Sequence, residues 1–140
     1  MPEEKLFTVG EANRTLPRLS RLLQSMRDRF RWLSSNRRAP SMMIKEFNVL
    51  NEGPVDRQYF AALVAIRRGM KEVESLGVQV KDIRTGLVDF PARLYGRNVL
   101  LCWRLGEEQV RFWHDLEAGF AGRQPIPDQG GEPDTGGERH

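Results

Sequence analysis

The stretch that decides the fold is residues 16–33, which read LPRLSRLLQSMRDRFRWL. Its apolar residues recur at alternating intervals of three and four: Leu16, Leu19, Leu23, Met26, Phe30 and Leu33. This heptad spacing places them in one stripe along a helix, as in a coiled coil. Because an apolar stripe of this length has to be buried, the stretch predicts a helix that packs against a partner helix.

The start of this helix is predicted by Thr8-Val9-Gly10-Glu11, which has the spacing of a capping box. In that motif the Thr8 hydroxyl accepts from the Glu11 N–H, and the Glu11 carboxylate accepts from the Thr8 N–H. Pro17 lies inside the apolar stretch. It either kinks the helix or lies in the first turn of a helix that restarts there. The sequence leaves both alternatives open.

A second helix is predicted from Pro54, after Pro40 ends the first helix and a loop runs through residues 41–53. This loop is apolar enough that we expect it to pack on the domain. The second helix repeats the heptad spacing at Tyr59, Leu63, Ile66, Met70 and Val73. Gly77 follows at the position of a left-handed stop. Residues 8–77 therefore predict an antiparallel helical hairpin.

From residue 78 the period changes to that of β-strands, which occupy residues 78–124 together with the motif-rich segment. We expect an edge strand over 78–83, a strand over 87–90, a central strand over 99–103 that is apolar on both faces, and a last strand over 110–114. Pro91 is expected only at an edge or a strand end. The fold class is therefore α+β: a helical hairpin with coiled-coil-like seams, packed with a small, mostly antiparallel sheet of about four strands. Residues 1–125 form one domain, and the polar residues 126–140 form a disordered tail.

Composition places this domain in the cytoplasm. No apolar run approaches the roughly 20 residues of a membrane helix, and the N-terminus lacks a secretory signal. Cys102 is the only cysteine, so no internal disulfide forms. Its apolar neighbours predict a buried, inert thiol. The net charge of +3 is small, but eight arginines between Arg14 and Arg38 are offset only by Asp28.

Polar residues interleaved with the strands are candidates for a site, because an unpaired buried charge is costly. We expect a ligand-binding or partner-binding cluster of Asp89, Arg104, His114, Glu117 and Arg123. The simplest structural role for Asp89 is an ion pair with Arg104 or Arg111 on a neighbouring strand. The sharper hypothesis is a divalent metal site formed by Asp89, Glu107, His114 and Glu117, whose nitrogen and oxygen atoms suit zinc, manganese or iron.

Two further surfaces are candidates for binding anions. The glycines Gly119 and Gly122 would let backbone N–H groups converge on an anion that Arg123 grips; alternatively, Arg123 pairs with Glu117 or Asp115. A nucleic-acid surface would use arginines of the first helix, with Trp32 as a stacking ring: Arg21, Arg27 and Arg31. No P-loop, dinucleotide-binding glycine run, Cys-x-x-Cys pair or nucleophile elbow is present.

Several segments together resemble a known family. They are Thr8-x-x-Glu-Ala-Asn, Gly53-Pro-Val-Asp, Gly77-Val-x-Val-Lys-Asp, Gly86-Leu-Val-Asp-Phe-Pro-Ala, Cys102-Trp-Arg-x-Gly-Glu and Phe112-Trp-His-x-x-Glu-x-Gly-Phe-x-Gly-Arg. Over about residues 6–125 the chain resembles a small prokaryotic family of unknown function, of the DUF2203 type. The resemblance implies a stand-alone bacterial cytoplasmic domain and assigns no catalytic residue.

The leading functional hypothesis is a binding module that uses the polar cluster on the sheet. The alternative is a metal-dependent enzyme that uses the carboxylates and His114. A second alternative is nucleic-acid binding through the arginine-rich first helix. The heptad seams also predict a homodimer through the helices.

Overall fold

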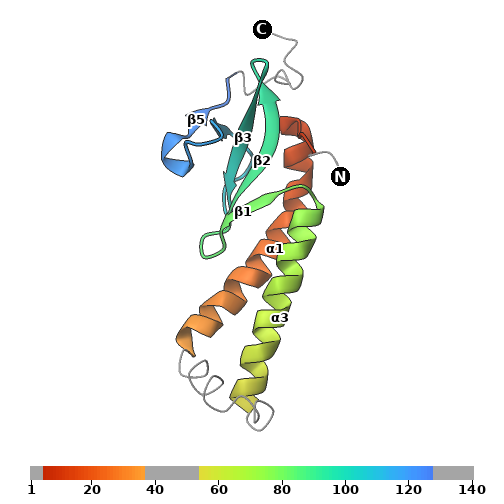
Figure 1. The fold of residues 1–140 in the computed structure, drawn as a ribbon, viewed down its shortest axis with the longest axis vertical. Coiled ribbons are helices and arrows are strands. Elements are labelled where there is room, and N and C mark those ends of the chain that lie inside the picture. Colours follow the sequence, from red (N-terminus) through yellow and green to blue (C-terminus); the bar gives the residue numbers. More distant parts are fainter. Residues whose placement is uncertain (1–4, 37–53, 128–140) are drawn as a thin grey trace.

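The computed structural model describes residues 5–36 and 54–127. Helices α1 (Val9–Ser35) and α3 (Pro54–Ser75) lie side by side and antiparallel, and an antiparallel sheet lies along one end of this hairpin (Figure 1). The predicted α+β class and helical hairpin are confirmed. The far end of the hairpin extends beyond the sheet (Figure 1). The predicted loop 41–53 lies outside the described residues.

Helix α1 begins where its capping box predicts. The Glu11 N–H donates to the Thr8 hydroxyl at 2.9 Å, and the Thr8 N–H donates to the Glu11 carboxylate at 3.0 Å. The helix runs through Pro17 from Val9, so a restart at Pro17 is excluded. Five of the six predicted stripe residues are buried, and Phe30 is half-buried. The stripe therefore faces the interior as expected.

Helix α3 begins at Pro54, and Gly77 follows its end with a φ of +90°, both as predicted. Of the predicted stripe, Val73 is buried and Tyr59, Ile66 and Met70 are half-buried, whereas Leu63 is 42% exposed and Ala62 is buried in its place. At Gly69 an added Cβ would lie only 2.7 Å from the Met26 Sδ. Small residues thus bring α3 close to α1, beside the predicted stripe of larger residues.

The sheet has five strands in the order β1-β2-β3-β4-β5. They are β1 (Gln79–Asp82), β2 (Leu87–Leu94), β3 (Arg97–Arg104), β4 (Phe112–His114) and β5 (Gln124–Pro125). Every neighbouring pair is antiparallel. The predicted edge position of the first strand and the central position of the third are confirmed. The short strand β5 was not predicted.

Two expectations about the ends of strands are corrected. The strand predicted over 87–90 continues through Pro91 to Leu94, and at Pro91 one side of β2 is an unpaired edge, one of its two expected positions. This is possible because β1 pairs only as far as Asp89, so Pro91 needs no N–H on that side, and its carbonyl accepts from the Phe7 N–H at 2.7 Å. Ile126, expected in the disordered tail, is 2% exposed, and its N–H donates to the Arg111 carbonyl at 2.8 Å. Residues 128–140 of that tail lie outside the described part of the chain.

The two faces of the sheet have different environments. One face packs against the helices, and it contributes Val88, Phe90, Val99, Leu101, Trp103 and Trp113 to the hydrophobic core. Side chains alternate along a strand, so Asp89, Cys102 and His114 point to the opposite face. This second face carries the buried polar side chains.

Candidate functional site

The candidate site is a buried polar cluster on strands β2, β3 and β4. Asp89 lies directly opposite Cys102 in the ladder between β2 and β3, and His114 lies opposite Leu100 in the ladder between β3 and β4. The exposed fractions are 2% for Asp89, 1% for Cys102 and 2% for His114. One ligand atom from each residue lies within 4.8 Å of the others. The strand register therefore brings a carboxylate oxygen of Asp89, the sulfur of Cys102 and a ring nitrogen of His114 close together.

Both ring nitrogens of His114 have partners. The Nδ1 atom lies 2.7 Å from the carbonyl oxygen of Asp115. A carbonyl oxygen can only accept, so Nδ1 carries the proton and donates it. The Nε2 atom lies 3.1 and 3.2 Å from the two carboxylate oxygens of Asp89. The backbone thus fixes the tautomer in which Nε2 faces the cluster.

Cys102 is held as a neutral thiol. Burial raises its pKa to about 11. A hydrogen bond from Arg123 Nε to Sγ, at 3.3 Å, lowers the pKa and only partly opposes the burial. The nearby Asp89 carboxylate raises it further. A thiol in this environment does not ionise near neutral pH without a cation beside it.

Arg123 and Glu107 cover the cluster. The Arg123 guanidinium donates from Nη1 and Nη2 to the two carboxylate oxygens of Glu107, at 2.9 and 2.8 Å. The Glu107 carboxylate also accepts from the Arg104 N–H at 2.8 Å. Burial would raise the pKa of Glu107, but these hydrogen bonds outweigh it and lower the pKa. Burial would lower the pKa of Arg123, but the same carboxylate and Cys102 raise it.

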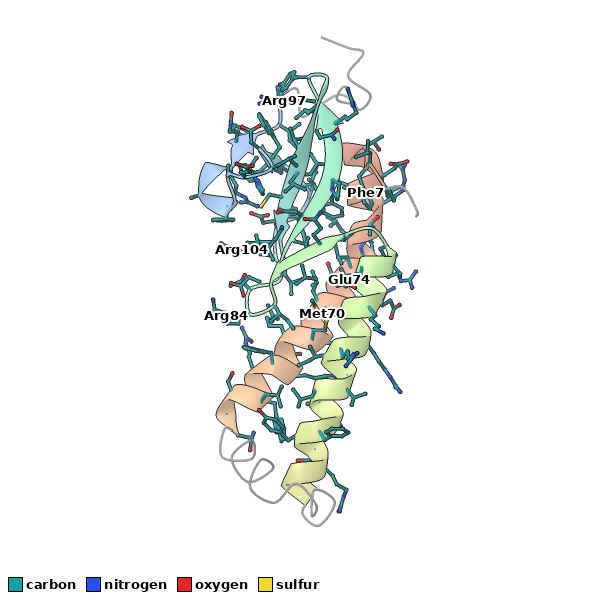
Figure 2. All side chains as sticks on the ribbon, in the orientation of Figure 1. Phe7, Met70, Glu74, Arg84, Arg97 and Arg104 are labelled. Atoms are coloured by element: carbon teal, nitrogen blue, oxygen red, sulfur yellow. The ribbon has the colours of Figure 1, made fainter. Side chains whose placement is uncertain are left out.

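Aromatic rings support the two arginines of this cover. The Arg123 guanidinium lies 4.3 Å from the ring centroid of Phe112 and 4.5 Å from that of Phe120. The Arg104 guanidinium lies 4.5 Å from the same Phe120 ring. Figure 2 shows Arg104 and Arg97 at opposite ends of β3. Phe120 belongs to η2 (Phe120–Gly122), the short 3-10 helix between β4 and β5. The segment after β4 is therefore tied to the end of β3.

The structure brings together only some of the residues predicted for the site. Asp89 and His114 meet as expected, but Cys102, which the sequence predicts to be inert, joins them. Glu107 and Arg123 lie next to the cluster, paired with each other. Glu117 is exposed in the turn after β4 and belongs to no ligand group among the described residues.

The predicted ion pairs of this region are corrected. The Asp89 carboxylate contacts the Nε2 of His114 and lies 3.9 Å from Lys81 Nζ; within the described residues it forms no ion pair with Arg104 or Arg111, the expected partners. Lys81 takes this place because β1 borders β2 on that side. Arg123 pairs with Glu107, not with Glu117 or Asp115, because the turn after β3 carries Glu107 toward it. Asp115 pairs instead with Arg97 at 3.1 Å.

A separate hollow of about 700 Å³ lies on the helical hairpin. It is lined by Arg21, Gln24, Ser25, Asp28, Arg29, Trp32, Gln58, Ala61 and Ala62. No buried polar cluster accompanies it among the described residues, so we place the candidate site at the sheet. Of the arginines predicted to bind nucleic acid, Arg21 lines this hollow and Arg31 is exposed, while Arg27 is half-buried. Nucleic-acid binding stays a prediction.

The fold and the cluster define a class: an α+β domain with a helical hairpin and a buried Asp–Cys–His group under an arginine-bearing loop. Residues 5–126 match the family model of the uncharacterised conserved proteins DUF2203, and the chain belongs to this family. Comparison with curated proteins and with solved structures gave no match. Within the described ranges, neither helix is long and apolar enough to cross a membrane.

Proposed function

We propose that this protein binds a divalent transition-metal ion through Asp89, Cys102 and His114. The observation that carries the proposal is the convergence of three different donor atoms within 4.8 Å in a fully buried site. Buried polar groups of this kind are costly unless they are paired or ligate a metal. The metal would therefore account for the convergence of three donor atoms in an otherwise apolar sheet.

The geometry of His114 supports metal binding. Two ligands that each lie about 2.0 Å from a tetrahedral zinc ion are about 3.3 Å apart. The Nε2 atom of His114 lies 3.1 and 3.2 Å from the oxygens of Asp89. Its Nδ1–H is donated to a backbone carbonyl, which is the usual way in which a ligating histidine is oriented. The lone pair of Nε2 would then be aimed at the metal.

The donor set favours zinc over harder ions. A thiolate, an imidazole and a carboxylate suit zinc, and also iron or cobalt, whereas magnesium and calcium prefer oxygen alone. Two anionic ligands would balance the charge of a divalent ion inside the protein. Three protein ligands leave one coordination position, at which a bound ion acts as a Lewis acid. The single cysteine, needed here as a reduced ligand, favours a cytoplasmic location.

A cysteine nucleophile fits the same residues less well. Such an enzyme needs a base that takes the thiol proton. The unprotonated nitrogen of His114, Nε2, faces the Asp89 carboxylate, and within the described residues no hydrogen bond joins it to Cys102. The pKa of Cys102 is also raised to about 11 by burial, which disfavours the reactive thiolate.

Elemental analysis of untagged protein tests the proposal. We expect about one zinc ion per chain, and we expect its loss in Asp89→Asn, Cys102→Ala and His114→Ala. Glu117→Ala is the matched control, because this exposed carboxylate should leave the metal in place. Full loss of metal in Glu117→Ala, or sub-stoichiometric metal in the parent with no thermal shift on adding zinc, would contradict the proposed ligand set.

We also propose that two copies associate through the helical hairpins in a coiled-coil arrangement. The far end of the hairpin has no sheet beside it (Figure 1), so among the described residues only the two helices bury its apolar side chains. Phe60 is 52% exposed and Leu63 is 42% exposed on α3. They lie three residues apart and therefore share one helix face. A second hairpin packed there would complete a four-helix core.

A further inference from the structure

The carboxylate of Glu107 is bound in the way that a protein binds an external oxyanion. It receives two parallel hydrogen bonds from the Arg123 guanidinium, at 2.8 and 2.9 Å, and a third from the Arg104 N–H at 2.8 Å. A bidentate guanidinium with a backbone N–H beside it is a common way to recognise a carboxylate or a phosphate. A side chain of the protein itself fills this position.

These donors are oriented by contacts that do not depend on Glu107. The Arg123 guanidinium is stacked on Phe112 and Phe120, and its Nη2 donates to the Cys102 carbonyl at 3.3 Å. The Arg123 side chain is only 14% exposed. Its position would therefore persist if Glu107 moved away, leaving a preformed and partly desolvated cation.

Arg104 adds a second positive charge to this position. Its guanidinium is stacked on Phe120 and exposed, and within the described residues it pairs with no carboxylate. Within the described residues, Glu107 is thus the only carboxylate paired with either guanidinium group, and both groups lie over the Phe120 ring. An added oxyanion would relieve this excess of positive charge.

Glu107 is placed so that it can leave. It lies in the turn after β3, and its side chain is 29% exposed. It also borders a hollow of about 570 Å³ between the N-terminal part of α1 and this turn, which is further lined by Asn13, Leu16, Pro17, Ser20, Trp103, Glu108 and Gln109. This hollow gives the Glu107 carboxylate a space into which it would move when a ligand replaces it.

We propose that Arg123 and Arg104 bind an external oxyanion, a phosphate or carboxylate group, and that Glu107 occupies the site until the ligand displaces it. The ligand would lie beside the Asp89–Cys102–His114 cluster, since the Arg123 Nε is 3.3 Å from the Cys102 Sγ. The binding needs no metal, so it is tested separately from the metal site.

The test is titration of the metal-free protein with inorganic phosphate and, separately, with malonate, followed by calorimetry. A carboxylate tethered to the site competes at a high effective concentration. We therefore expect Glu107→Ala to bind one of the two anions more tightly than the parent, by about tenfold or more. Arg104→Ala in the Glu107→Ala background should weaken that binding about tenfold. Glu74→Ala, which removes an exposed carboxylate on α3 away from the site, should match the parent.

The two anions separate the two ligand sources. Binding of phosphate alone would identify a phosphate-bearing ligand, and binding of malonate alone a carboxylate. Circular dichroism establishes that each variant is folded; if Glu107→Ala is not, Glu107→Gln removes the charge and keeps the shape. Should that variant unfold too, a phosphate-induced or malonate-induced rise in Tm of the parent that Arg104→Ala abolishes supports the proposal. The absence of this rise, or equal anion affinity in the parent and a folded Glu107 variant, overturns it.

Discussion

Cys102 illustrates how a residue's face decides its role. Its apolar neighbours Leu101 and Trp103 predict a buried, inert thiol, and both the burial and the raised pKa of Cys102 agree with this, but these neighbours belong to the core face of β3. The residues that share the face of Cys102 come from other strands, Asp89 and His114. Alternation in β3 predicted that Cys102 points away from Trp103. It could not predict the register that places Asp89 opposite Cys102.

The pairing of Glu107 with Arg123 could not be predicted from the sequence either. Both were candidate site residues, and both lie next to the cluster. Their pairing depends on the turn after β3 and on the 3-10 helix before β5. These segments have no repeating hydrophobic pattern from which their conformation could be predicted. Glu117 lies outside the cluster for a related reason. His-x-x-Glu shares a face only in a helix, and the chain forms a turn after His114.

The buried thiol makes stability depend on pH in the alkaline range. Burial raises the pKa of Cys102 from 9.0 to about 11, so above pH 9 the unfolded chain binds fewer protons than the folded protein. Stability is thus full below pH 9 and falls as pH rises toward 11, by about 1.4 kcal/mol per pH unit. Urea unfolding of metal-free protein at several pH values measures this slope. In Cys102→Ala the slope should be smaller by one proton; an equal slope in both proteins would contradict the assignment.

Among the elements, the helices were predicted best, because capping and stop signals are local. The Thr8–Glu11 box and the left-handed Gly77 both act where the sequence placed them. The strand β5 could not be predicted, because a strand of two residues is formed by its neighbour β4. The continuation of β2 through Pro91 likewise depends on where β1 stops.

The turn between β1 and β2 requires glycine for two reasons. Gly86 has a φ of +72°, and a Cβ there would lie 2.5 Å from the Leu105 Cβ. Gly96, in the turn between β2 and β3, has a φ of +76° with open space around it. We expect Gly96→Ala to cost about 1 kcal/mol for backbone strain alone. Gly86→Ala should cost about 3 kcal/mol, because overpacking is added.

Denaturant unfolding of the two glycine variants separates strain from crowding, because each serves as the other's control. Both glycines have a similar positive φ, so the cost of backbone strain is common to the two variants. Equal losses in the free energy of unfolding would show that Leu105 gives way at no cost, against the packing described here.

At the scale of the whole molecule, the two ends of the hairpin differ in what surrounds them. The N-terminal half of α1 is covered by the sheet, whereas the far end relies on α3 alone within the described chain (Figure 1). Trp32 and Tyr59 pack there at 6.3 Å between ring centroids. The chemistry-bearing residues and the proposed association surface are therefore well separated, so that each can be altered without disturbing the other.

The proposed dimer is tested by size-exclusion chromatography with light scattering at tens of micromolar. The parent should have twice the mass of one chain, and Phe60→Glu with Leu63→Glu should be a folded monomer, because buried charges oppose the interface. Arg111→Glu, a charge reversal at an exposed residue before β4, lies off the hairpin and should leave the dimer intact. A monomeric parent would remove the dimer proposal.

The Val110 N–H donates to the Asn13 side chain at 2.7 Å across a separation of 97 residues. The strands, by contrast, join mostly through short turns, so their pairing is local. Closing a long loop costs entropy before any contact repays it. The sheet and the hairpin should thus form early, each within its own segment, and the docking of α1 onto the sheet should come late in folding. The folding rate would then be set by one long-range event, even though nearly every element of the protein is built from neighbours in the chain.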